Sequence, residues 1–341
     1  QKEIPDDHWF YVRSCIRQSF FPASEHYFLR ICRDMLGRDI YESAHHTTCG
    51  GIAYHADTIP QETAMTIVAR QFALMTEAGY KNLVTSCITS FGNYTEILET
   101  WREFPELEAR IREILWKATR REFKTPKYLA HASDLIYKFR NEIAEQAKFR
   151  LVDKATGAPL RVVEHIGCHY SKMFPHKGVG GAEYPCVLSG MAEAWGGKVI
   201  DYPERRHCCG FGFRQYLVKA NRGYSVSNTH KKFESMEPYH PDMIITNCPG
   251  CPFFLDRWQY VISEQTGKTY GEGGRGIPVF TYEELAGMVL GFAPWDLGLQ
   301  THQVSVEPLL DKMGVEHDPA KKYLGKNGKD LGHPEPCACL K

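Results

Sequence analysis

Five cysteines in the sequence are spaced so that together they could hold a metal centre. They form the pattern Cys-x39-Cys-Cys-x38-Cys-x-x-Cys. Deprotonated thiols are the ligands of iron–sulfur clusters, and they also suit zinc. Five thiols exceed the four that a cubane cluster or a tetrahedral zinc ion needs, which indicates a cluster of unusual shape, or four ligands and one reactive thiol. We interpret the pattern as an iron–sulfur site made by Cys168, Cys208, Cys209, Cys248 and Cys251.

The residues beside these cysteines favour a cluster. Pro249 and Gly250 form a tight turn whose backbone N–H groups can stabilise the negative charge of a thiolate-ligated cluster. The side chains of Cys208 and Cys209 diverge because the residues are adjacent, so each could serve a different iron of a larger cluster. Gly210, which follows them, allows close approach of the backbone.

The composition excludes several classes of protein. Lys plus Arg and Asp plus Glu both number 41 in the 341 residues, so nothing favours nucleic acid as a partner. No apolar run is long enough to span a bilayer, and the N-terminal residues do not resemble a secretory signal. Twelve cysteines without such a signal favour a cytoplasmic, reducing compartment, where clustered thiols usually bind metal or do redox work.

Strands and helices that alternate along the chain are expected to position the cysteines. The predicted strands cover residues 8–14, 39–41, 82–86, 161–166, 198–202, 242–246 and 278–280. The predicted helices cover residues 24–36, 61–79, 93–118 with a break at Pro105, 132–148, 184–196, 225–236, 251–265 and 282–290. The cysteines of the pattern fall at turns that lead from a strand into a helix.

The sequence also contains an internal repeat. Three cysteines of the first half correspond in order to three of the second. The pairs are Cys15 with Cys168, Cys49 with Cys209, and Cys87 with Cys248. We therefore predict an α/β fold of two pseudo-repeated domains, each a small parallel sheet flanked by helices, with the clusters at the carboxyl ends of the strands. The expected boundaries are 1–150, 151–292 and a loosely structured or docking extension over 293–341.

The cysteine pattern resembles the cysteine-rich CCG domain. Two such domains in tandem, over about residues 8–291, resemble the B subunit of heterodisulfide reductase and its relatives in sulfur-oxidising organisms. The resemblance implies that Cys168, Cys208, Cys209, Cys248 and Cys251 bind a non-cubane [4Fe-4S] cluster and act catalytically through it. It further implies an oxidoreductase subunit acting on thiols or disulfides, which needs a ferredoxin-like iron–sulfur subunit and a flavin-bearing subunit as partners.

The N-terminal half departs from this pattern. It keeps Cys15, Cys49 and Cys87, but Thr48 and Ser90 stand where the second half has cysteines. Three thiolates could hold a second [4Fe-4S] or a [3Fe-4S] cluster, with zinc as the weaker alternative; equally, this half could be a degenerate domain kept for its fold. The candidate fourth ligands are His45, His46, Asp57 and Ser90. The asymmetry favours a complex of sulfur oxidation, acting on a carrier-bound thiol or persulfide.

Other residues have two interpretations each. His207 and His169 flank ligand cysteines and could donate a proton or a hydrogen bond, or they could be solvent-exposed loop residues. Cys32 lies on the apolar face of a predicted helix and is expected in the core. Cys337 and Cys339 could form a mobile dithiol or be two free thiols.

Two other functions fit the same residues. The chain could be an electron-transfer or assembly subunit of a different oxidoreductase of the succinate or glycolate/lactate type that uses the CCG domain. It could also be a protein with structural zinc in place of iron.

Overall fold

Two four-stranded parallel sheets form the framework of the protein. The computed structural model describes residues 3–174, 177–181, 184–211, 222–318 and 320. The strands of the first sheet are β1 (Trp9–Val12), β2 (Ile40–Glu42), β3 (Asn82–Thr85) and β4 (Tyr128–His131). Those of the second are β5 (Arg161–His165), β6 (Lys198–Val199), β7 (Met243–Thr246) and β8 (Val279–Thr281). The strand orders are β2-β1-β3-β4 and β6-β5-β7-β8. The same order in both halves confirms the predicted α/β fold with an internal repeat.

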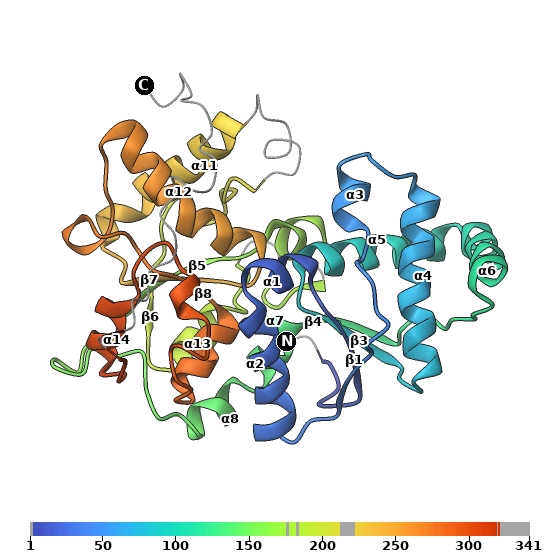
Figure 1. The fold of residues 1–341 in the computed structure, drawn as a ribbon, viewed down its shortest axis with the longest axis horizontal. Helices are drawn as coiled ribbons and strands as arrows, with labels where there is room; N and C mark the ends of the chain where they lie inside the picture. The colour runs from blue at the N-terminus through green and yellow to red at the C-terminus, as the bar shows by residue number, and fades with distance from the viewer. Residues whose placement is uncertain (1–2, 175–176, 182–183, 212–221, 319, 321–341) are drawn as a thin grey trace.

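Helices connect the strands and cover the sheets. In the first half they are α1 (Cys15–Phe20), α2 (Pro22–Arg30), α3 (Gly51–His55), α4 (Gln61–Glu77), α5 (Ile88–Glu103), α6 (Pro105–Thr119), α7 (Ala132–Lys138) and α8 (Arg140–Glu145). In the second half they are α9 (Ser189–Ala194), α11 (Arg222–Met236), α12 (Gly250–Thr266), α13 (Tyr282–Val289) and α14 (Glu307–Met313). Two π-helical turns, η1 (Ile31–Met35) and η2 (His169–Met173), complete the connections. The two halves lie side by side, with α2 against α13 between them (Figure 1).

The apolar core is continuous across the two halves. Strand residues alternate between a central cluster and an outer one, since both faces of a parallel sheet are covered. In β1, Trp9 and Tyr11 belong to the central cluster and Phe10 to the outer cluster of the first half. In β7, Ile245 belongs to the central cluster and Ile244 to the outer cluster of the second half. The central cluster thus takes residues from both sheets, and the boundary at residue 150 remains a prediction.

Several details of the predicted elements are wrong: α1 and α3 were not predicted, and the helix predicted over 132–148 is two helices, α7 and α8. Strand β4 was not predicted, because its four residues, Tyr-Leu-Ala-His, are too few to show an alternation. The helix predicted over 184–196 begins only at Ser189. The extension after residue 293 was expected to be loosely structured or a docking segment; its described part is not loosely structured, since it contains α14, whose Leu309 and Leu310 are buried in the central core.

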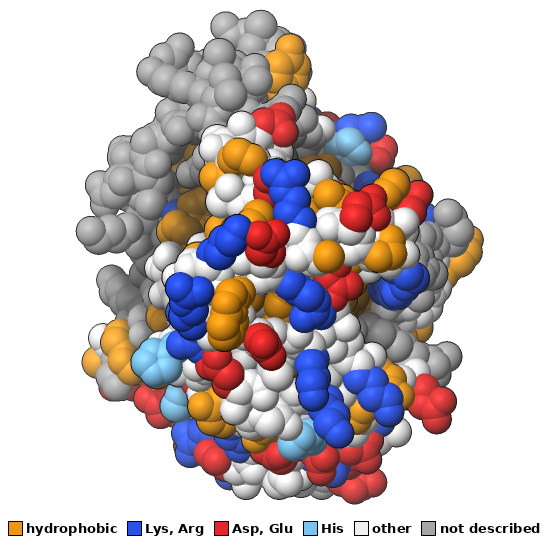
Figure 2. All heavy atoms as spheres, turned by 90° about the vertical axis from the view of Figure 1, so that its right-hand side faces the viewer, with side chains coloured by type: hydrophobic (Ala, Val, Ile, Leu, Met, Phe, Trp, Pro, Cys, Tyr) orange, Lys and Arg blue, Asp and Glu red, His pale blue; other side chains and the backbone are white. Residues whose placement is uncertain are grey.

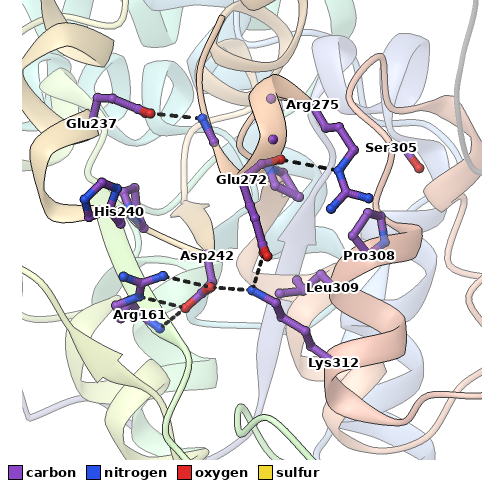
Figure 3. A pocket seen from close by; sticks show the side chains of 15 residues that line it. Arg161, Glu237, His240, Asp242, Glu272, Arg275, Ser305, Pro308, Leu309 and Lys312 are labelled. Atoms are coloured by element: carbon purple, nitrogen blue, oxygen red, sulfur yellow. Dashed lines mark hydrogen bonds and ion pairs between the residues drawn. The ribbon is translucent and has the colours of Figure 1, made fainter.

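Ion pairs fix α14 at the edge of the second sheet opposite the cysteines. Lys312 Nζ lies 2.9 Å from Asp242 Oδ1 and 2.7 Å from Glu272 Oε2 (Figure 3). Arg161 also pairs with Asp242, at 3.2 Å. These four residues line a pocket, and each of them is paired there with a residue of opposite charge.

The outer surface of the first half carries charges of both signs. Figure 2 shows lysines and arginines interspersed with aspartates and glutamates on this face. Pairs such as Arg112 with Glu108 and Lys117 with Glu113 lie one helical turn apart on α6. No helix in the described part of the chain is both long and apolar enough to cross a membrane.

Candidate metal centre

The loops at the carboxyl ends of β5, β6 and β7 bring five cysteines together. Cys168 follows β5, Cys208 and Cys209 lie between β6 and α11, Cys248 follows β7, and Cys251 lies in the first turn of α12. Cys209 Sγ lies 3.3 Å from Cys251 Sγ, within hydrogen-bonding distance for two sulfur atoms. Further thiol contacts join Cys168 to Cys208, Cys208 to Cys209, and Cys251 to Cys248. All five thiols therefore lie in one continuous chain of contacts.

These thiols influence one another's charge. Hydrogen bonds from Cys168 and Cys209 to the Cys208 sulfur lower the pKa of Cys208 to about 2 and raise that of Cys168. Burial raises the pKa of Cys251 well above that of an ordinary thiol. The site cannot hold five thiolates at once unless cations neutralise them, and metal binding must therefore release protons.

Two glycines allow this close approach. Gly210 has a φ of +99°, and a Cβ there would meet the Ser225 carbonyl and lie 2.6 Å from Thr229 Oγ1. A Cβ at Gly167 would lie 2.8 Å from Cys248 Cβ. Side chains at these positions would displace the cysteines of two different loops.

A buried lysine that the sequence pattern does not reveal supports the loop before Cys208. Lys232, on α11, is fully buried. Its ammonium group donates to the carbonyls of Glu204 at 2.8 Å, Arg205 at 2.9 Å and His207 at 3.2 Å. Burial lowers its pKa to about 7. A lysine in a charged helical stretch is expected at the surface, so no local pattern could have revealed this role.

Lys232→Met is expected to lower the free energy of unfolding by about 1–3 kcal/mol, because three buried carbonyls lose their donor. The neighbouring Lys231 is exposed and pairs with Glu204 Oε1 at 3.0 Å, so Lys231→Met should cost less than about 1 kcal/mol. Urea unfolding of the two variants measures the difference. Equal losses would show that Lys232 does not support the loop.

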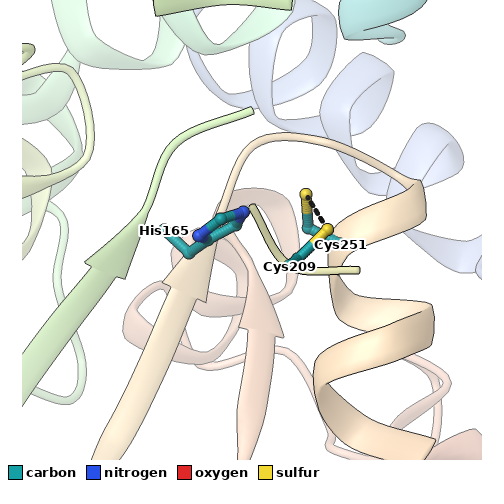
Figure 4. Close-up of side chains that lie close together, drawn as sticks. All are labelled: His165, Cys209 and Cys251. Atoms are coloured by element: carbon teal, nitrogen blue, oxygen red, sulfur yellow. Dashed lines mark hydrogen bonds between the residues drawn. The ribbon is translucent and has the colours of Figure 1, made fainter. Parts of the chain in front are cut away.

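A histidine also lies at the five thiols. His165, the last residue of β5, is 1% exposed and forms a compact group with Cys209 and Cys251, whose ligand atoms lie within 4.8 Å of one another (Figure 4). It is the one such group found among the described residues. Burial lowers its pKa well below the usual value, so the ring is neutral. In the sequence, His165 is an ordinary member of a strand and carries no signal of this position.

The two histidines that the sequence singled out have other contacts. His207 Nε2 lies 3.2 Å from Asn228 Oδ1, and its Nδ1 lies 3.4 Å from Glu204 Oε2. His169 is half-buried and stacks on His55 of α3, with ring centroids 5.0 Å apart. Burial lowers the pKa of His169 to about 4. His169 therefore belongs to the junction between the halves, and a catalytic role for His207 remains a prediction.

The N-terminal cysteines form a second, looser group. Cys15 is exposed, whereas Cys49 and Cys87 are buried, and burial raises the pKa of Cys87 to about 12. The Ser90 hydroxyl hydrogen-bonds to the Cys49 sulfur, and Thr48 Oγ1 lies 4.0 Å from Cys15 Sγ.

Ser90 is thus a candidate fourth ligand that the structure places at a cysteine. His45 and Asp57 are exposed, and His46 Nδ1 lies 2.7 Å from the Ser43 carbonyl oxygen.

A buried arginine connects the two groups of cysteines. Arg17, on α1, donates to the carbonyl of Ser86 at 2.8 Å and to that of Asn247 at 3.3 Å. These residues directly precede Cys87 and Cys248. Arg17 also pairs with Glu283 Oε2 of α13 at 2.7 Å, and both side chains are fully buried. The hydrogen bonds of one arginine therefore join the two cysteine loops, and its ion pair with Glu283 fixes that arginine in place.

Four cysteines lie outside the two groups, and one of them, Cys186, is half-buried. Cys32 is fully buried in the central core, as predicted, and burial raises the pKa of its thiol. Cys337 and Cys339 lie outside the described residues.

The fold and the thiol group define a known class of domain. Residues 162–256 match the family described as "Cysteine-rich domain" (CCG), and this range includes all five clustered cysteines. The chain is 26% identical over 323 residues to the B subunit of the ferredoxin:CoB-CoM heterodisulfide reductase of Methanosarcina acetivorans, in a match that covers 92% of this chain and 98% of the relative. The predicted resemblance to the B subunit of heterodisulfide reductase is thereby confirmed.

Two more distant similarities accompany it. The chain is 23% identical over 150 residues to the 8-methylmenaquinol:fumarate reductase membrane anchor subunit of Wolinella succinogenes, covering 44% of this chain and 50% of that one. The crystal structure of a hypothetical protein from Helicobacter pylori has a similar fold, with a TM-score of 0.61 and 14% identity. That match covers 88% of this chain, which spans about half (53%) of the Helicobacter chain.

Proposed function

We propose that this chain is the iron–sulfur subunit of a heterodisulfide-reductase-like complex. In this proposal Cys168, Cys208, Cys209, Cys248 and Cys251 bind a non-cubane [4Fe-4S] cluster, and the complex carries out thiol/disulfide or sulfur-transfer redox chemistry there. The observation that carries the proposal is the continuous chain of contacts among these five thiols at the edge of one sheet.

The residues present fit such a cluster. The donor set is thiolate, which iron–sulfur clusters require. The five thiols need cations before they can all ionise, and His165 has both ring nitrogens without a hydrogen-bond partner among the described residues. A cluster of this kind supplies single electrons to a sulfur–sulfur bond. The chain's own residues orient it through the Lys232-supported loop and keep Cys209 and Cys251 away from water.

The proposal includes partners and a substrate class. A subunit with a buried cluster must receive its electrons from other proteins. The proposal therefore includes a ferredoxin-like iron–sulfur subunit and a flavin-bearing subunit, and it places the complex in the cytoplasm. The substrate would be a thiol or disulfide, carrier-bound if the complex serves sulfur oxidation. The first half has Ser90 where the second half has Cys251, and this difference between the halves supports a carrier-bound substrate. Cys15, Cys49 and Cys87 would hold a second [4Fe-4S] or a [3Fe-4S] cluster in the N-terminal half.

Metal and sulfide analysis of the full chain, purified without oxygen, tests the proposal. We expect a brown protein with about four irons and about four sulfides at the C-terminal site, in addition to any in the N-terminal half. A colourless chain with stoichiometric zinc would contradict it.

Two other functions have specific observations in their favour. The compact group of His165, Cys209 and Cys251 could hold a single zinc ion, which the same analysis would detect. The similarity to a fumarate reductase subunit favours a role in electron transfer in another oxidoreductase. In that case the chain would contain iron, but the assembled complex would not reduce disulfides.

A further inference from the structure

We propose that His165 donates a hydrogen bond to the sulfur ligands that Cys209 and Cys251 supply to the metal centre, and that this bond makes the C-terminal site chemically distinct from the N-terminal one. The inference rests on the proposed function and extends it to a residue outside the cysteine pattern.

The position of His165 supports this role. It ends β5, and its ring points from the end of the strand toward Cys209 and Cys251 (Figure 4). At least one ring nitrogen and both sulfurs lie within 4.8 Å of one another. The side chain is 1% exposed, so water cannot serve as its partner from outside.

The hydrogen-bonding capacity of His165 is unused within the described structure. Neither Nδ1 nor Nε2 has a hydrogen-bond partner among the described residues. A neutral imidazole carries one N–H donor, and leaving a buried polar group unpaired costs about 1–3 kcal/mol. A neutral thiol is a weak acceptor, whereas a metal-bound thiolate or a cluster sulfide carries negative charge and accepts strongly. The single N–H group of His165 therefore has a strong acceptor beside it when those sulfurs bind a metal centre.

The internal repeat provides a comparison within the same chain. His165 stands three residues before Cys168, and Val12 stands three residues before Cys15. The strand registers agree, because Val12 pairs with Thr85 and His165 pairs with Thr246 at the same place in each sheet. Val12 packs in the outer apolar cluster of the first half. The N-terminal site therefore has a methyl-bearing side chain where the C-terminal site has an N–H donor.

A hydrogen bond to a ligand sulfur stabilises the more negative, reduced form of a cluster and raises its reduction potential. A charge-assisted hydrogen bond is strong enough to change the ratio of reduced to oxidised cluster about tenfold at a fixed potential. For a one-electron couple, a tenfold change corresponds to about 59 mV. In this proposal His165 tunes the cluster as a hydrogen-bond donor and is not one of its ligands.

The test compares three variants of the full chain, each purified without oxygen. His165→Val copies the residue of the N-terminal half, and His165→Gln keeps an N–H donor. His26→Ala is the control, because it removes an exposed imidazole from α2. Iron content and the midpoint potential of the C-terminal cluster, followed by electron paramagnetic resonance, are measured for each. We expect His165→Val to keep its iron and to favour the oxidised cluster about tenfold more than the unsubstituted chain. His165→Gln should recover part of the shift, and His26→Ala should show none.

Three results would overturn the inference. An iron-loaded His165→Val chain with an unchanged potential would show that no such hydrogen bond exists. Loss of iron from a His165→Val chain that remains folded would show that His165 is a metal ligand and not a donor. If the valine variant does not fold, electron–nuclear double resonance on the unsubstituted chain with 15N-labelled histidine decides. A donor predicts a weak coupling to an imidazole nitrogen, and the lack of such a coupling contradicts the inference.

Failure of the proposed function gives a different result. An unsubstituted chain without iron and sulfide contradicts both proposals, whereas an iron-loaded chain that is insensitive to His165 contradicts this inference alone.

Discussion

Cys209→Ala is expected to remove the iron of the C-terminal site, about four atoms per chain, while the fold remains. Cys209 lies in the middle of the thiol chain, in contact with Cys208 and Cys251, and it is buried. Iron and sulfide analysis and the visible absorption spectrum measure the loss.

Cys32→Ala is the matched control for this experiment. Cys32 is also a buried thiol, but it lies in the π-helical turn η1 within the central core. Its replacement should cost stability through lost packing and leave the iron content unchanged. Full retention of iron by Cys209→Ala would show that the five-cysteine ligand set is wrong.

Arg17→Met is expected to lower the free energy of unfolding by about 3–5 kcal/mol, the cost of leaving one charge of a buried pair without its partner. Both side chains of the Arg17–Glu283 pair are fully buried. Removal of the guanidinium also frees the carbonyls that precede Cys87 and Cys248. The double variant Arg17→Met, Glu283→Gln should recover part of the loss, since no charge is then left in the core.

The pH dependence tests the cause of this loss. Burial raises the pKa of Glu283 to about 7 even beside Arg17. A carboxyl group whose folded-state pKa is raised contributes most to stability at low pH, and the contribution falls as pH rises through that pKa. The charge of Arg17 lowers this pKa, so the pKa of Glu283 rises further in Arg17→Met, and the deficit of the variant should be larger at about pH 8 than at about pH 5.5.

Urea unfolding at both pH values measures the deficit, with the exposed Arg102→Met as control. A deficit that does not change with pH would mean that lost packing, and not a stranded carboxylate, destabilises the variant.

The sequence predicted those parts of the site that depend on local pattern. A buried strand that runs into Cys168 or Cys248 is visible as an apolar run before a turn, and the order of the strands then brings the turns together. The repeat also predicted that the two halves share one fold. Helix α14 was missed because the surrounding glycines and prolines suggest a loop, whereas its Leu310 is held by long-range packing.

The supporting residues could not have been predicted in the same way. Arg17 and Lys232 lie on helices and carry charges, so a surface position is the normal expectation for both. Both hold backbone carbonyls, which leave no mark in the sequence. His165 belongs to a strand that is otherwise apolar or charged, and only the folded structure brings its ring to the cysteines.

The Arg17–Glu283 pair also has a consequence for when the cysteine loops are fixed during synthesis. Asn247, whose carbonyl Arg17 holds, precedes Cys248, and Glu283 follows all five clustered cysteines in the chain. During synthesis, Arg17 and all five clustered thiols therefore leave the ribosome before the carboxylate that completes the buried ion pair of Arg17. The guanidinium that holds both cysteine loops gains its counter-charge only when α13 has been made, so the loops are expected to reach their final arrangement late in synthesis.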